Sequence, residues 1–154
     1  MDTSESALSI FKNGFNCAQA VLAASVEKTD LPDQVAYRIA CGFGAGMGRR
    51  QKTCGAVSGG IMVIGMLYGR DGSRTDEAKE KTYSVVNAFM DEFEKRHSTT
   101  ECRELLGCDL NTEEGKRKYI DSRLYSTVCL ECIRDVTAIL EEVCPGKSDK
   151  DPHG

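Results

Sequence analysis

Apolar side chains recur at intervals of three and four residues along most of this chain, as they do on one face of a helix. Helices are predicted over residues 6–13, 17–28, 31–41, 54–68, 75–97, 101–106, 111–120 and 127–143. No segment shows the strict alternation or β-branched enrichment of a strand. The pattern therefore predicts an all-α fold of six to eight helices, with a single compact domain over residues 1–146 and a polar, disordered tail over residues 147–154.

Glycine dominates the stretch between Cys41 and Gly69. Four glycines alternate with other residues over positions 42–48, which favours irregular backbone rather than a regular element. The cationic side chains that follow are Arg49, Arg50 and Lys52. Cys54 then opens a run of small and apolar residues, so we expect it at the N-terminus of a buried helix. The glycines that would let neighbouring helices and backbone close around that point are Gly55, Gly59 and Gly60.

Composition and charge narrow the class of protein. With 154 residues, 40% of them hydrophobic and 29% charged, the chain is an ordinary globular domain. Its net charge is −4 with both signs interspersed, which argues against a nucleic-acid binder. The longest apolar run, residues 59–68, is about half the ~20 residues of a membrane span, and no signal peptide precedes the domain. We therefore expect a cytoplasmic protein.

Cysteine is the residue type that carries candidate chemistry. The eight are Cys17, Cys41, Cys54, Cys102, Cys108, Cys129, Cys132 and Cys144. In a reducing compartment such enrichment indicates metal binding or redox chemistry. Four of them fall at or near the start of a predicted helix, where exposed amides favour a thiolate: Cys17, Cys54, Cys102 and Cys132. Cys41 closes a predicted helix, and core packing is the simpler interpretation there.

Four thiolates brought together would be a soft ligand set, suited to an iron–sulfur cluster or to zinc. A zinc ribbon needs two C-x-x-C pairs, and only Cys129 and Cys132 form one. That pair lacks a βαβ setting, which disfavours a thioredoxin-type site. Neither a G-x-G-x-x-G fingerprint nor a phosphate-binding loop is present, so nucleotide binding is weakly supported. The chain also lacks C-x-x-C-H, the haem attachment motif.

Four segments resemble the signature blocks of the redox-active proteins named for the pattern C_GCAxxG_C_C. They are GFNCAQAV around Cys17, CGAVSGG from Cys54, ECRELLG around Cys102 and CIRDVTAIL from Cys132. The blocks occur in the expected order and span nearly the whole chain. The family is similar to a domain of split-Soret cytochromes, in which a cysteine-bound iron–sulfur centre has been suggested. The resemblance implies a redox role for the four cysteines, without haem.

Three functions follow as hypotheses. In the leading one, Cys17, Cys54, Cys102 and Cys132 hold a [2Fe–2S] or [4Fe–4S] cluster that transfers electrons, with Cys129 as an alternative to Cys132. In the second, Cys54 is the attacking thiol of a metal-free dithiol enzyme and Cys17 or Cys102 resolves it. The third is a structural zinc site. The expected partners are an electron donor or acceptor and a second copy of the chain in a symmetric dimer.

Overall fold

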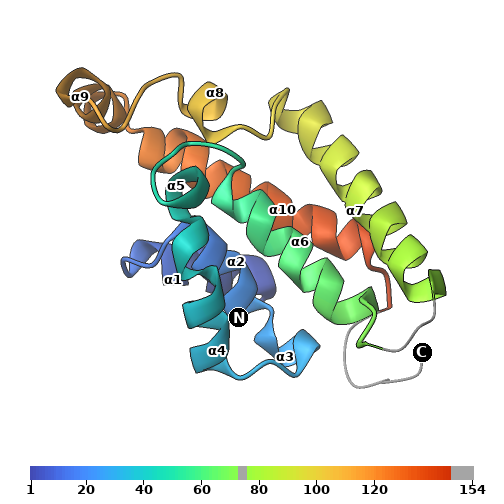
Figure 1. The fold of residues 1–154 in the computed structure, drawn as a ribbon. Coiled ribbons are helices and arrows are strands. Elements are labelled where there is room, and N and C mark those ends of the chain that lie inside the picture. The colour runs from blue at the N-terminus through green and yellow to red at the C-terminus, as the bar shows by residue number, and fades with distance from the viewer. Residues whose placement is uncertain (73–75, 147–154) are drawn as a thin grey trace.

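The computed structural model describes residues 1–72 and 76–146, and its regular structure is helical (Figure 1). The α-helices are α1 (Thr3–Lys12), α2 (Cys17–Ala24), α3 (Val26–Thr29), α4 (Asp33–Ala40), α5 (Gly44–Met47), α6 (Gly55–Tyr68), α7 (Asp76–His97), α8 (Cys102–Leu106), α9 (Glu113–Asp121) and α10 (Leu130–Val143). A 3₁₀ turn, η1 (Cys41–Phe43), and a π-helical turn, η2 (Tyr125–Cys129), complete the set. Within the described ranges, the only β pairing is an isolated bridge between Thr53 and Glu101.

The all-α prediction is confirmed, and the helix count is higher than predicted. Seven helices have eight or more residues, which falls within the predicted six to eight. The short helices α3 and α8 raise the number among the described residues to nine, above that range, while the segment labelled α5 is a left-handed turn. The predicted helix over 17–28 is divided at Ser25, whose backbone leaves helical geometry. The predicted disordered tail, residues 147–154, lies outside the described residues.

Local sequence accounts for where α1 and α2 begin. Asp2 caps α1 and Asn16 caps α2, each accepting a hydrogen bond from the backbone N–H three residues on. The side chains of Glu5 and Gln19 in turn accept a hydrogen bond from the backbone N–H of the cap residue, which completes a capping box at each helix. Because Asn16 sets the start of α2, the next residue, Cys17, occupies the first helical position.

The core lies where α2, α6, α7 and α10 meet. Figure 1 shows α6, α10 and α7 running side by side, with α1 to α4 on the other side of α6. The side chains of Ile64, Phe89 and Ile133 are fully buried between these helices. Gly60 permits the close approach of α6 and α7, because a Cβ there would lie 2.5 Å from Phe89 Cζ. None of the described helices is long and apolar enough to cross a bilayer.

The glycine-rich stretch forms a left-handed loop. Five consecutive residues, Ala45 to Arg49, have φ between 50° and 70°, and Gln51 has φ 55°. Hydrogen bonds from Gly48 N to Gly42 O and from Lys52 N to Gly46 O close the loop on itself. Glycine adopts this conformation freely, but each other L-residue pays roughly 1–2 kcal/mol. The prediction of irregular backbone is confirmed.

Candidate functional site

Five cysteines from separate parts of the chain line one cavity, which we call the thiol pocket. They are Cys17, Cys54, Cys102, Cys129 and Cys132. The cavity has a volume of about 150 Å³, and its other walls are mainly apolar, formed by Phe11, Ala45, Leu105, Leu106, Leu110 and Val128. All four cysteines singled out from the sequence are therefore brought together. Cys129, the alternative to Cys132, lies in the same pocket.

Cys54 is the thiol whose ionised form is most favoured. It is the N-cap of α6, and its sulfur lies beside the Cys132 thiol and the backbone N–H groups of Val57 and Ala56, whose hydrogen-bonding capacity favours the thiolate. These groups lower the pKa of Cys54 although the side chain is buried. The same interaction raises the pKa of Cys132, because Cys132 loses the proton that it shares with Cys54 when it ionises. The predicted position of Cys54 at a helix N-terminus is confirmed.

Cys17 faces Cys54 from the start of α2. Burial and the neighbouring thiols of Cys54 and Cys129 raise the pKa of Cys17 to about 12. A hydrogen bond from the backbone of Ala45 lowers this pKa, but by less. Without a positive charge in the pocket, Cys17 therefore keeps its proton at neutral pH. Gly55 makes room for its sulfur, because a Cβ at that position would lie 2.4 Å from Cys17 Sγ.

Gly59, the second glycine predicted to act at the site, lies one helical turn beyond Gly55 and does not line the thiol pocket. A Cβ there would lie 2.9 Å from the carbonyl oxygen of Ala18 and 3.1 Å from Val21 Cβ. Gly59 thus lets α6 pack directly on α2, and it supports the pocket through this helix contact. A role for either glycine toward a cofactor stays a prediction.

Cys102 is held against the loop by a backbone hydrogen bond. Its backbone N–H donates to Lys52 O at 2.7 Å, which places Cys102 at the first position of α8. Burial and the nearby Cys54 raise its pKa to about 12, while a hydrogen bond from Gln51 acts in the opposite direction. Gln51 is only 2% exposed and also bonds Cys108 O and Leu110 N, each at 2.8 Å. Sequence reasoning missed Gln51, because a glutamine between cationic residues looks like a surface residue.

The C-x-x-C pair is positioned by the π-helical turn η2. The N–H of Leu130 donates to Tyr125 O, a bond that spans five residues rather than four. Cys129 and Cys132 both reach the pocket from this widened turn. Tyr119 contacts Cys129 with 3.9 Å between its hydroxyl and the sulfur, and burial raises the pKa of Cys129 to about 11.

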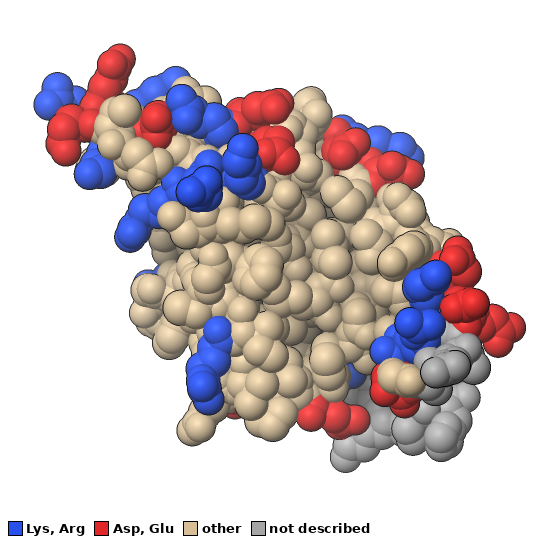
Figure 2. Space-filling view, viewed as in Figure 1, with Lys and Arg blue, Asp and Glu red and all other residues tan. Residues whose placement is uncertain are grey.

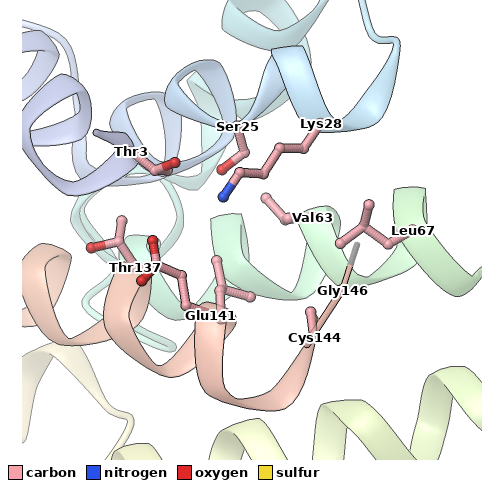
Figure 3. Close-up of a pocket in the computed structure, with 10 residues that line it drawn as sticks. Thr3, Ser25, Lys28, Val63, Leu67, Thr137, Glu141, Cys144 and Gly146 are labelled. Atoms are coloured by element: carbon pink, nitrogen blue, oxygen red, sulfur yellow. The ribbon is translucent and has the colours of Figure 1, made fainter. Parts of the chain in front are cut away.

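The three remaining cysteines do not line the thiol pocket. Cys41 is exposed, so the interpretation of core packing was wrong; η1 carries the chain outward, and Cys41 O accepts a hydrogen bond from Asn16 Nδ2. Cys108 is buried next to the pocket, in a small cluster with Cys102, Leu106 and Leu124. Cys144 lines a second cavity of about 240 Å³ (Figure 3), at the end of α10 away from the thiol pocket and beside Lys28 and Glu141.

The thiols of the pocket converge without forming a ready ligand set for a single ion. Among residues 1–72 and 76–146, no three His, Cys, Asp or Glu side chains are gathered closely enough to hold one metal ion. Two of the five sulfurs, those of Cys54 and Cys132, share a hydrogen bond. The pocket can therefore act in two ways. Cys54 and Cys132 can serve as a dithiol that forms a disulfide, or several of the five thiolates can bind a group that fills the cavity.

Fold and site together define a small all-α protein with a buried, thiol-lined centre. A family profile described as "Putative redox-active protein (C_GCAxxG_C_C)" matches residues 15–143. The match covers most of the chain, so the chain belongs to this redox-active family, as its four cysteine blocks indicated. No curated protein and no solved structure matches it significantly.

Proposed function

We propose that the protein is an electron carrier in which Cys17, Cys54, Cys102 and Cys132 hold an iron–sulfur cluster. The observation that carries this proposal is the meeting of the four motif cysteines at one apolar pocket, although they are spread over more than 100 residues. Cysteine thiolates are the usual ligands of both [2Fe–2S] and [4Fe–4S] centres, and both use four of them.

The size of the pocket supports a cluster as the first candidate. In a tetrahedral zinc site the Zn–S bonds of about 2.3 Å place the sulfurs about 3.8 Å apart. The described side chains form no set gathered for a single ion, whereas the cysteines surround a cavity of about 150 Å³. A cluster carries its own iron and sulfide between the ligands, and so it suits sulfurs spaced around a cavity.

Several groups of the chain would tune such a centre. When bound, an iron–sulfur cluster accepts and releases single electrons. The backbone of Ala45, Ala56 and Val57 lies beside the sulfurs of Cys17 and Cys54, and the side chain of Gln51 lies beside Cys102, each placed to lower the pKa of that thiol. Hydrogen bonds to ligand sulfur stabilise added negative charge and raise the reduction potential, while the apolar wall limits access of water.

Electron paramagnetic resonance tests the proposal. Protein reconstituted with iron and sulfide and reduced with dithionite should give a signal from one unpaired electron per cluster, which disappears on reoxidation. Single replacements of Cys17, Cys54, Cys102 or Cys132 by Ser should abolish or shift the signal. Cys41→Ser is the matched control, because Cys41 is exposed and does not line the pocket. A full signal in all four motif variants would refute the assignment of ligands.

One observation favours a metal-free dithiol as the second candidate: Cys54 and Cys132 line the same pocket, where the Cys132 thiol lowers the pKa of Cys54. In this function Cys54 attacks a disulfide substrate and Cys132 displaces the product, so two thiols lose two protons and two electrons as one disulfide forms. Mapping of metal-free protein oxidised with diamide should then recover a Cys54–Cys132 peptide. Recovery of a Cys54–Cys17 or Cys54–Cys102 peptide would instead support the resolving thiols predicted from sequence.

A further inference from the structure

Three cationic side chains project from the loop beside the thiol pocket. They are Arg49, Arg50 and Lys52, all exposed. None forms an ion pair with a described residue, whereas the cations of α7, such as Arg96, are paired with acidic side chains. In a protein of net charge −4 these three free cations make a local positive surface, which we call the cationic loop.

The cationic loop lies next to the thiol pocket without lining it. Ala45, four residues before Arg49, lines the pocket, and Gln51, between Arg50 and Lys52, bonds the backbone of Leu110, another lining residue. Lys52 lies two residues before Cys54, so their Cα atoms are at most about 7.6 Å apart. The backbone that carries Lys52 therefore lies next to the pocket, and its exposed side chain extends into solvent beside it.

The structure fixes this loop in place. Asn111 Nδ2 donates to Arg49 O at 2.8 Å, and Arg103 N donates to Gln51 O at 3.0 Å. Left-handed conformations at non-glycine residues cost free energy, and proteins concentrate such strain where a local geometry is needed for function. Figure 2 shows Lys and Arg side chains gathered over α5, with Asp and Glu side chains among them toward α9, beside a broad surface without charged side chains.

We propose that the cationic loop is the docking site for an acidic electron-carrier protein that exchanges electrons with the thiol pocket. This inference depends on the proposed electron-transfer function. Opposite charges steer encounter and fix orientation more than they add affinity, which suits brief electron-transfer complexes of small area. The uncharged surface beside the loop fits a protein partner better than a nucleic acid, whose footprint is typically a more extended row of phosphate contacts.

Oxidation of the reduced, cluster-loaded protein by small complexes of opposite charge tests the local field at the site. Hexacyanoferrate(III) and hexaammineruthenium(III) each take one electron without forming a bond, while the cluster loses one. The variant is Arg49→Glu, Arg50→Glu, Lys52→Glu. The control is Arg38→Glu, Lys79→Glu, Lys95→Glu, which changes the total charge equally on α4 and α7. Rates are measured by stopped flow at low and at high salt.

The loop variant should react at least about ten-fold more slowly than the wild type with the anionic oxidant at low salt, and faster with the cationic one. The control should change much less, and high salt should remove the difference. Equal effects of the two triple variants would overturn the docking site. Wild-type protein that reduces neither oxidant would instead count against the proposed electron-transfer function.

Competition identifies the kind of partner. Poly-glutamate should slow the reaction of wild-type protein with hexacyanoferrate(III) and should have little effect on the loop variant. Oligothymidylate of the same total charge should compete more weakly, because the loop offers only three free cations for a phosphate backbone. Stronger competition by the oligonucleotide would overturn the assignment to an acidic protein.

Discussion

At position 55 only glycine leaves room for the neighbouring sulfur. Replacing Gly55 by Ala would place a Cβ 2.4 Å from Cys17 Sγ, so either α2 or the sulfur must shift. We expect a loss of about 1–3 kcal/mol in the free energy of unfolding, as for other overpacked sites, together with weaker cluster loading. Gly65→Ala is the control in the same helix, because no atom lies within 4 Å of a Cβ there.

Chemical denaturation and iron content measure the two effects. Gly65→Ala should be neutral or stabilising by up to about 1 kcal/mol, since Ala favours a helix more than Gly does. If Gly55→Ala keeps wild-type stability and iron content, the close contact between α6 and Cys17 does not constrain the site.

Single residues also mark what could not be foreseen from sequence. Cys54 was predictable at a helix start, because glycine-rich backbone gives way there to an apolar run. Gln51 was not, since its burial arises from Cys108 and Leu110, which lie more than 50 residues away and bond both ends of its amide. The pairing of Cys54 with Cys132 rather than Cys17 likewise depends on tertiary geometry.

At the scale of elements, Gln51 fastens the left-handed loop to the segment after α8. Gln51→Ala would leave Cys108 O and Leu110 N without their partner in a buried region. Each such group costs about 1–3 kcal/mol, so we expect a loss of about 2–6 kcal/mol in stability. Gln34→Ala, at an exposed position of α4, should change stability by less than about 0.5 kcal/mol. A loss no larger than that of the control, measured by urea unfolding, would contradict this role for Gln51.

Helices were foreseen better than the segments that join them. The long helices α6, α7 and α10 follow an apolar pattern or a cap that the sequence displays. The left-handed turn could not be predicted from such a pattern. Ala45, Met47 and Arg49 take positive φ only under constraint from the rest of the fold. The π-helical turn η2 was missed for the same reason, since its wider hydrogen bond has no residue signature.

For the molecule as a whole, the buried thiols make the metal-free protein sensitive to alkali. Thiols in the unfolded chain lose protons near pH 8.5, whereas Cys17, Cys102 and Cys129 keep theirs until about pH 11–12. Between these limits the folded state binds more protons, so stability falls as pH rises. The lowered pKa of Cys54 makes stability rise with pH, but this single group is outweighed by the three thiols whose pKa is raised.

The thermal midpoint of metal-free protein should therefore decrease as pH rises from about 8 to about 10.5. Cys17→Ser should show a shallower decrease than the wild type, because serine does not titrate in this range. A midpoint that stays constant or rises with pH would show that the pocket thiols ionise as readily as thiols in the unfolded chain.

Iron and acid-labile sulfide content, measured on protein purified without oxygen, tests the central claim most directly. We predict iron and sulfide in nearly equal amounts in the wild type, with the visible absorption of a cluster, and loss of both in Cys54→Ser. If neither appears, even after reconstitution with iron and sulfide, the cluster is contradicted and the Cys54–Cys132 dithiol becomes the function to pursue.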